Sequence, residues 1–219
     1  MDSRILSDQL KKPTGDTGRE VAEMLNNSNQ SLYDLAFEIT NLEADQHLLE
    51  IGFGNGRHFP QYFDQEAELH ITGVDFSRDM CNEARTHNAD LIKEGKVEIQ
   101  CTDSASLPFA DHTFDLVVAI NVVYFWDPPA PYIREIRRVL KDGAHFLIGF
   151  RPRNTVEHLE FTKHNFTLYE AGELLTLLSK HGFSEVQQKT LTREKNAMDG
   201  TKVMVDDSCL LVKKNNPKV

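Results

Sequence analysis

Short apolar runs alternate with amphipathic stretches through the middle of the chain. The apolar runs cover residues 47–51, 69–75, 97–101, 114–120 and 144–150. Near-continuous apolar runs of this length indicate strands buried on both faces, as in a parallel sheet. Helical spacing is found between them, over residues 57–66, 77–94 and 130–141, with Asp142 and Gly143 ending the last helix. This alternation predicts βαβ units and a doubly wound α/β sheet.

The pattern changes near the C-terminus. Residues 168–181 have the spacing of a helix, and two strands are expected over 183–192 and 203–213. A polar loop containing Asp199 and Gly200 joins these strands. Because no helix separates them, we expect them to pair antiparallel.

Residues 1–45 precede the alternating region and differ from it. Proline and glycine in residues 11–18 indicate a loop. Two helical stretches are expected after it, the first carrying Val21, Met24 and Leu25, and the second capped by Asn29 or Ser31. We therefore divide the chain into an N-terminal helical extension, residues 1–45, and a main domain, residues 46–214.

Composition and charge narrow the classes of partner. The 219 residues carry a formal net charge of −10, which disfavours binding to nucleic acid or to an anionic membrane surface. No apolar run approaches the roughly 20 residues of a membrane helix, and we expect no secretory signal. The three cysteines form no CxxC pair, so we expect no zinc or other metal site, no disulfide framework and a reducing, cytoplasmic setting.

A glycine-rich segment follows the first predicted strand and opens a helix. It reads Glu50-Ile51-Gly52-Phe53-Gly54-Asn55-Gly56-Arg57. A dinucleotide site needs G-x-G-x-x-G, whereas the spacing here is G-x-G-x-G. Glu50 would face a pyrophosphate poorly but suits a ligand with cationic groups. S-adenosylmethionine has an ammonium group, a sulfonium group and one carboxylate for the helix terminus.

Two further acids follow the next two strands. Asp75 ends the strand at 69–75, where a carboxylate can accept hydrogen bonds from both ribose hydroxyls. Asp103 follows the strand at 97–101, where it can accept from an adenine amino group. Taken singly, the glycines could form a tight turn, Asp75 a helix cap and Asp103 a turn. Their occurrence at three successive strand ends favours a ligand site.

Four motifs in order resemble the class I S-adenosylmethionine-dependent methyltransferases. They lie at 48–56, 73–80, 107–115 and 135–143, and the strong resemblance covers roughly residues 46–151. The resemblance is closer to the small-molecule branch that includes the ubiquinone and menaquinone biosynthesis enzymes. It implies a Rossmann-like, doubly wound, seven-stranded and mostly parallel sheet, with a C-terminal antiparallel strand pair. One departure is Asp142-Gly143-Ala144 in place of a commoner Pro-Gly-Gly turn.

The resemblance also implies roles for particular residues in holding S-adenosylmethionine. Glu50 and the loop glycines Gly52, Gly54 and Gly56 would hold its methionine end, and Asp75 its ribose. Phe76 and Met80 would pack on the adenine, which Asp103, Ser104 and Ala105 would border. Asn121 falls where the cofactor would meet the substrate pocket.

Aromatic residues after the fourth strand are candidates for the substrate pocket. We hypothesise that Tyr124, Phe125 and Trp126 form part of its wall, and that Tyr33 contacts substrate from an N-terminal extension acting as a lid. The alternatives are that the three aromatic residues pack under the following helix and that the extension docks on the sheet edge. Asp127-Pro128-Pro129 differs from the motif of methyltransferases acting on DNA bases, because it lies six residues beyond Asn121 and no aromatic residue follows it.

The leading hypothesis is therefore an enzyme that transfers a methyl group to a small-molecule acceptor. A nicotinamide-dependent oxidoreductase and a non-catalytic S-adenosylmethionine-binding protein are the alternatives. Methyl transfer does not always require a base, and we assign none among the nine histidines. His158 and His164 lie in a stretch expected near the pocket.

Overall fold

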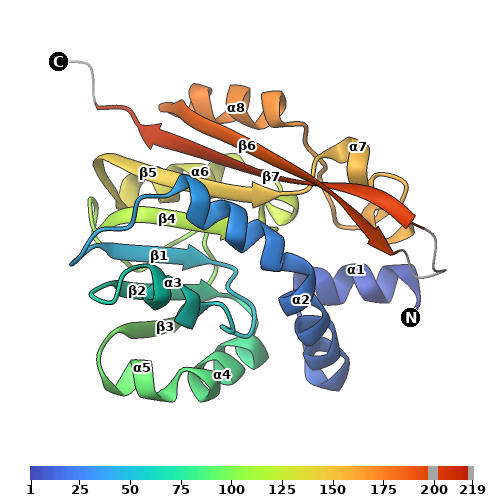
Figure 1. The fold of residues 1–219 in the computed structure, drawn as a ribbon, viewed down its shortest axis with the longest axis horizontal. Helices are drawn as coiled ribbons and strands as arrows, with labels where there is room; N and C mark the ends of the chain where they lie inside the picture. Colours follow the sequence, from blue (N-terminus) through green and yellow to red (C-terminus); the bar gives the residue numbers. More distant parts are fainter. Residues whose placement is uncertain (197–201, 217–219) are drawn as a thin grey trace.

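The computed structural model describes residues 1–196 and 202–216. Its centre is a seven-stranded sheet with the strand order β3-β2-β1-β4-β5-β7-β6 (Figure 1). The strands are β1 (His47–Ile51), β2 (His70–Asp75), β3 (Val97–Cys101), β4 (Phe114–Ile120), β5 (Leu140–Phe150), β6 (Phe183–Asn196) and β7 (Lys202–Lys214). The first five strands are parallel, while β7 is antiparallel to both β5 and β6. The predicted fold class is confirmed.

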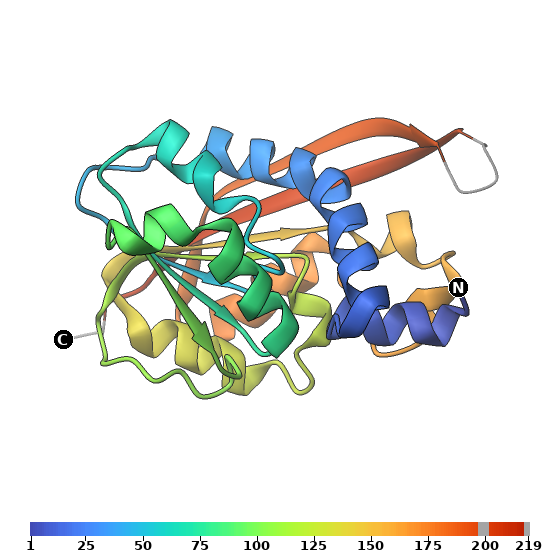
Figure 2. The ribbon, with the colours of Figure 1, turned by 90° about the horizontal axis from the view of Figure 1, so that it is seen from below.

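Helices cover both faces of the sheet (Figure 2). On one face lie α2 (Gly15–Ile39), α3 (Phe59–Gln65) and α4 (Arg78–His87); on the other lie α6 (Ala130–Val139) and α8 (Ala171–Lys180). The remaining helical segments are α1 (Ser3–Lys11), α5 (Ala89–Lys93), η1 (Val123–Phe125), α7 (Arg153–Val156) and η2 (Glu160–Lys163). Burial of the central strands on both faces explains their near-continuous apolar sequences.

The N-terminal extension differs from its prediction. The expected loop over 11–18 is confined to residues 12–14, and α2 is one helix of 25 residues instead of two. Gly18 lies inside α2, and the Pro13 backbone approaches it so closely that a β-carbon there would lie 2.7 Å from the Pro13 carbonyl carbon. Asn29 and Ser31 are not caps; both side chains make long-range hydrogen bonds, Asn29 with Asn121 and Ser31 with Asp207.

Two other boundaries were wrong. The helix expected over 130–141 stops at Val139, because Leu140 is extended and pairs with Phe114 in the sheet. Gly143, with φ of +73°, lies within the irregular start of β5 and does not end a helix. The helix expected over 77–94 is divided at Asn88, whose amide donates to the carbonyl of Gly56.

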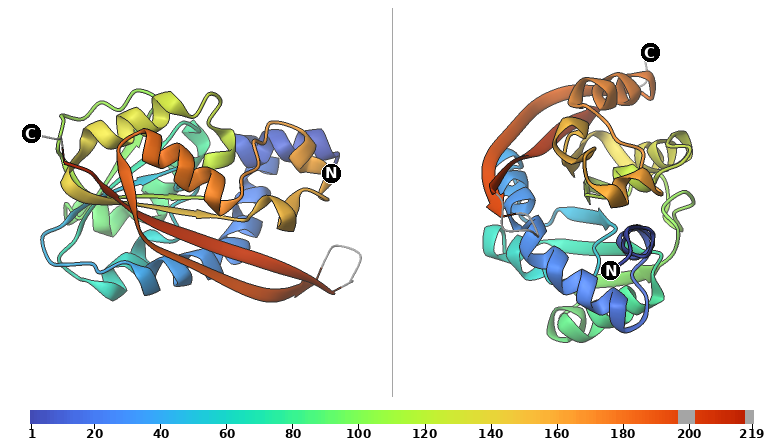
Figure 3. Two further views of the ribbon diagram at one scale, coloured as in Figure 1. Left: turned by 90° about the horizontal axis from the view of Figure 1, so that it is seen from above. Right: turned by 90° about the vertical axis from the view of Figure 1, so that its right-hand side faces the viewer.

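The last two strands form a hairpin that reaches past the other strands (Figure 3). The predicted antiparallel pairing is confirmed, from Phe183 opposite Lys214 to Asn196 opposite Lys202. The predicted Asp199-Gly200 loop lies outside the described residues. Along its middle the hairpin runs beside α2, and contacts between them bring the N-terminal extension onto the sheet.

Candidate active site

A cavity lies at the carboxyl ends of β1, β2, β3 and β4. Its walls include Gly52 and Gly54 after β1, Asp75 and Phe76 at the end of β2, and Asp103, Ser104 and Asn121 after β3 and β4. The carboxyl edge of an open α/β sheet is the usual place for a ligand. The structure thus brings most of the predicted cofactor residues together around one space.

The glycine loop closes one end of this cavity. Gly52 has φ of +70°, and a β-carbon there would lie 2.5 Å from Val122 Cγ2. Gly54 has φ of +62°, and a β-carbon there would meet nothing within 4 Å. The two glycines therefore allow a left-handed backbone, and Gly54 leaves open space on the cavity wall.

Asp75 is held rigidly beside this loop. Its carboxylate accepts hydrogen bonds from the backbone N–H groups of Ser77 (2.8 Å) and Gly54 (3.2 Å). Only 7% of the residue is exposed, and burial raises the pKa of its carboxyl to about 6 despite these hydrogen bonds. The next side chain, Phe76, is 40% exposed, with Lys12 Nζ 5.3 Å from the centre of its ring. A flat apolar face thus borders the cavity next to a buried acid.

Glu50 lies deeper than the sequence suggests and does not border the cavity. Its Oε1 accepts a 2.5 Å hydrogen bond from the Tyr33 hydroxyl, and Tyr33 does border the cavity. Glu50 Oε2 has no hydrogen-bond partner among the residues the structure describes. Burial raises the pKa of the Glu50 carboxyl to about 7. The site therefore holds an incompletely satisfied buried acid behind Tyr33.

Three other predicted cofactor residues do not border the cavity. Gly56 packs against Ala84 and Asn88, so its role is to let the loop approach α4. Met80 is fully buried at the start of α4. Ala105 contributes its backbone N–H to Asp103 Oδ1 (2.9 Å), which fixes the turn after β3.

The predicted substrate residues occupy different positions. Tyr33, Phe125 and Trp126 border the cavity, and Trp126 stacks on Tyr132 with 5.5 Å between ring centres. Tyr124 lies behind the wall, where its hydroxyl contacts Asn121 Oδ1 (3.1 Å) and the backbone of Arg151. Tyr124 therefore positions Asn121 instead of facing a ligand.

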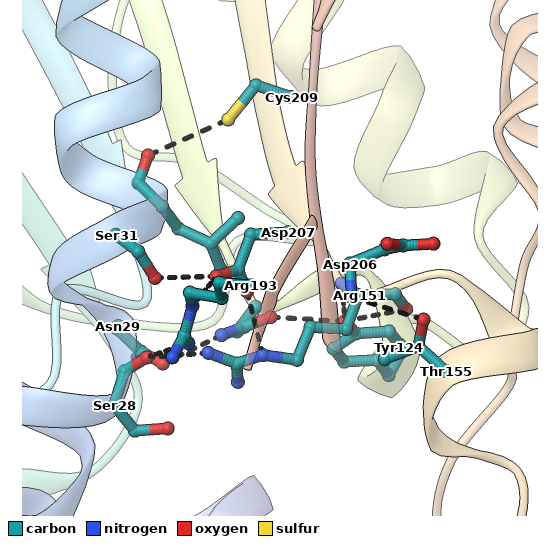
Figure 4. Close-up of polar contacts among 12 residues, drawn as sticks. Ser28, Asn29, Ser31, Tyr124, Arg151, Thr155, Arg193, Asp206, Asp207 and Cys209 are labelled. Atoms are coloured by element: carbon teal, nitrogen blue, oxygen red, sulfur yellow. Dashed lines mark hydrogen bonds and ion pairs between the residues drawn. The ribbon is translucent and has the colours of Figure 1, made fainter. Parts of the chain in front are cut away.

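Asn121 links the sheet to the N-terminal extension. It has a φ of +56° at the end of β4, and its side-chain amide donates to Asn29 Oδ1 on α2 (2.8 Å). Nearby, Asp207 is fully buried and ion-paired with Arg151 and Arg193, and it also accepts a hydrogen bond from Ser31 (Figure 4). These contacts fasten the middle of α2 to β5 and to the hairpin.

The N-terminal extension covers the cavity. Besides Tyr33, its lining residues are Leu10, Lys11, Pro13, Ala22, Leu25, Asn26 and Asn29. Ser7 anchors α1 by donating to the carbonyl of His164 (2.7 Å), and the carbonyl of Pro13 accepts from Ser77. The extension is therefore part of the cavity wall, as the lid hypothesis requires.

Sequence reasoning missed several lining residues. The most prominent is His58, directly after the glycine loop, whose ring stacks on Tyr33 with 3.7 Å between ring centres. Its position at the first turn after the loop was the available signal. His158 and His164 are absent from the cavity wall. Within residues 1–196 and 202–216, no cluster of three or more acidic, cysteine or histidine side chains has the geometry of a metal site.

The similarity to known proteins lies in the part of the chain that forms the central strands. Residues 49–148 match the family model described as "Methyltransferase domain". The O-methyltransferase resE of Aspergillus sclerotiorum is 31% identical over 48% of this chain and 40% of its own length. The phosphatidylethanolamine N-methyltransferase of Cereibacter sphaeroides is 35% identical over 46% of this chain and 48% of its own length. Each match thus spans less than half of the relative.

The fold has a close counterpart among solved structures. A chain in the complex between the Trm112 methyltransferase activator and a methyltransferase of Haloferax volcanii superposes with a TM-score of 0.78. That match covers 90% of this chain and 94% of the other, at 16% identity. In the described part of the chain, no helix has the length and apolar character needed to cross a membrane. Together, the family match over residues 49–148 and the fold show that this part of the chain is a methyltransferase domain, in a chain with the fold of solved methyltransferases.

Proposed function

We propose that the protein transfers a methyl group from S-adenosylmethionine to a small-molecule acceptor within the covered cavity. The observation that carries this proposal is the position of Asp75. Its buried carboxylate and the exposed ring of Phe76 share one cavity with the open space at Gly54 and with Asp103. These groups match a ligand that offers ribose hydroxyls, an adenine ring and an amino group.

The residues around the cavity fit S-adenosylmethionine. Asp75 would hold the ribose hydroxyls, Phe76 would pack on the adenine, and Asp103 would accept from the adenine amino group. Glu50 would favour the cationic methionine end, since its carboxyl is buried and no described residue forms an ion pair with it. When bound, S-adenosylmethionine supplies an electrophilic methyl group and a sulfonium that is a good leaving group.

The remaining residues of the cavity wall form the side that would hold the methyl acceptor. Phe125, Trp126 and Tyr33 provide aromatic surface, and Asn29 and Asn121 provide amides at its border. A closed, partly aromatic space aligns a small acceptor and excludes water, and alignment accounts for much of the rate in such a displacement. The extension over the cavity supports a small molecule over a macromolecular substrate. The names of the two relatives include both an O- and an N-methyltransferase, so either acceptor atom is compatible.

Calorimetry tests the cofactor assignment. Wild-type protein is expected to bind S-adenosylmethionine and S-adenosylhomocysteine, but not NADH. Asp75→Ala should weaken binding roughly ten- to hundredfold, because hydrogen bonds to a charged group are lost. Asp90→Ala, at an exposed site on α5, is the matched control. Absence of binding by the wild type, or equal affinities of both variants, would contradict the proposal.

Transfer itself requires a separate measurement. Protein incubated with S-adenosylmethionine labelled in the methyl group and a small-molecule extract is expected to release a labelled product of low mass. Binding of the cofactor with no labelled product in any extract would favour a non-catalytic binding protein.

A further inference from the structure

His58 is the one histidine on the described cavity wall, and its environment is unusual. Only 6% of the residue is exposed, and its Nε2 has no hydrogen-bond partner anywhere in residues 1–196 and 202–216. An unpaired buried polar atom is costly unless a ligand completes it. The ring is held in place by stacking on Tyr33, with an angle of 15° between the planes.

A chain of side chains determines which nitrogen of His58 carries the proton. On α2, the Gln30 amide donates to Asp34 Oδ1 (2.8 Å), and a carboxylate can only accept, so the orientation of Gln30 is defined. Gln30 and Gln61 then form a reciprocal amide pair, with distances of 2.9 and 3.0 Å. That pairing directs the Gln61 amino group, 3.2 Å away, at His58 Nδ1.

Nδ1 is therefore an acceptor, and in a neutral imidazole the proton lies on Nε2. Burial lowers the pKa of His58 to about 4, so the ring is neutral near pH 7. His58, which borders the cavity, thus carries a single, uncharged and buried N–H donor.

The surroundings indicate what this donor meets. Tyr33 joins His58 to Glu50, since its ring stacks on the imidazole and its hydroxyl binds Glu50 Oε1. Glu50 lies behind Tyr33 and does not border the cavity, but its buried carboxyl, with Oε2 unpaired among the described residues, favours a cationic group nearby. An α-amino acid group carries such a cation, its ammonium, and on the same carbon a carboxylate that can accept from His58.

We propose that His58 is a specificity residue whose Nε2–H donates to the carboxylate of the methionine portion of the cofactor. This rests on the proposed function, because it assumes that S-adenosylmethionine occupies the cavity. The Asp34–Gln30–Gln61 chain acts as a positioning device that keeps the donor on Nε2. Because Gln30 and Asp34 belong to α2, the covering helix itself prepares the donor.

Paired ligands test the proposal by calorimetry. S-adenosylhomocysteine carries the carboxylate, whereas 5′-methylthioadenosine lacks the whole amino-acid group. His58→Phe keeps an aromatic ring for Tyr33 but removes the donor. We expect it to weaken S-adenosylhomocysteine binding roughly ten- to hundredfold and to change 5′-methylthioadenosine binding less than about threefold. His70→Phe, at an exposed site at the start of β2, is the matched control and should change neither.

The outcomes separate this inference from the proposed function. If wild-type protein binds neither ligand, the proposed function fails. If it binds both and His58→Phe weakens neither, or weakens both equally, the role of His58 is overturned. Loss of affinity for a methyl acceptor alone would also overturn it, since the donor would then serve the acceptor.

A measurement on wild-type protein makes the test independent of whether the variant folds. Nitrogen-15 spectra of labelled histidine are expected to show His58 as the neutral Nε2–H tautomer at pH 7. Saturation with S-adenosylhomocysteine should shift its Nε2 resonance more than saturation with 5′-methylthioadenosine does. An Nδ1–H tautomer, or equal shifts with the two ligands, would overturn the proposal.

Discussion

Two buried acids at the site, Glu50 and Asp75, create a conflict between the stability of the protein and ligand binding. Among the described residues neither Glu50 nor Asp75 has an ion-pair partner, and burial raises the pKa of both carboxyls, for Asp75 against the opposing effect of Lys12. A carboxyl whose folded pKa lies above its unfolded value lowers the free energy of unfolding as pH rises towards the folded value. A cationic ligand would offset this cost. Such strain is typical of binding sites that trade stability for function.

Glu50→Gln tests this conflict directly. The pKa of about 7 exceeds the ordinary value of 4.5, so ionisation of Glu50 should cost on the order of 3 kcal/mol of unfolding free energy at pH 8. The amide keeps a partner for Tyr33 without the charge. We expect the variant to melt at a higher temperature than wild type at pH 8, with most of the difference gone at pH 5, and to bind S-adenosylhomocysteine more weakly. Glu20→Gln, on the exposed face of α2, is the control; a pH-independent difference would argue against the buried charge as its cause.

Trp126 offers a second test at this scale. It is the only tryptophan of the chain, is almost fully buried and borders the cavity. We expect saturating S-adenosylhomocysteine or a methyl acceptor to change the intensity of tryptophan emission, because either ligand alters the surroundings of the indole. Trp126→Phe should abolish the signal. An unchanged spectrum with both ligands would count against a place for Trp126 in the site.

At the scale of elements, α2 is the segment that joins the cavity to the rest of the fold. Asn29 contacts Asn121 at the end of β4, and Ser31 contacts Asp207 on β7 (Figure 4). The carbonyl of Ser28 also accepts from the guanidinium groups of Arg151 and Arg193. These contacts explain why α2 continues through Asn29 and Ser31: their side chains are used in tertiary contacts and not in local capping.

Asp207→Ala is expected to loosen this junction. Removing the shared carboxylate leaves two partly buried guanidinium groups without their partner, and breaking a buried pair in this way costs about 3–5 kcal/mol. Denaturant unfolding should show a loss of that size. Asp206→Ala, one residue earlier and partly exposed, should cost much less. Similar losses for both variants would show that the ion pairs contribute little.

On the scale of the whole molecule, the 25-residue helix and α1 convert an open sheet edge into a covered cavity. The β6–β7 hairpin contacts α2 from one side (Figure 3). Of the short helices after β5, α7 contacts β7 and η2 contacts α1. The N-terminal extension and the sheet domain thus share one site. The division at residue 45 stays a useful description of the sequence, while the cavity belongs to both parts.

Removal of residues 1–13 tests the cover. The deletion takes away α1 and the lining residues Leu10, Lys11 and Pro13, while the described contacts of Asp75 with Ser77 and Gly54 remain. We expect faster dissociation of S-adenosylhomocysteine, followed by Trp126 emission in stopped flow, with a smaller change in the association rate. Ser7→Ala, which removes one anchor of α1, should have an intermediate effect. Unchanged dissociation in the truncated protein would contradict the lid hypothesis.

Local pattern was sufficient to predict the sheet, its antiparallel end and the residues at the carboxyl ends of the first four strands. Buried strands are apolar, and the residue after a parallel strand lies at the ligand edge wherever the helices pack. Asp75 and Asp103 could be placed in this way, whereas Phe76 and Asn121 were placed by the resemblance to the methyltransferases. The local pattern could not predict how deeply a side chain is buried or which way it points. Glu50 lies behind Tyr33, and Tyr124 lies behind Asn121.

The sequence by itself thus determined the alternation of strands and helices in the main domain and the chemistry available at the strand ends, since both depend on neighbours along the chain. Only the tertiary structure decided which residues face the cavity, that α2 is continuous, and that His58 carries an unpaired donor. Those features depend on contacts between residues far apart in sequence, such as Asn29 with Asn121 and Ser31 with Asp207. Such partners are set by the packing of whole elements, which no local periodicity records.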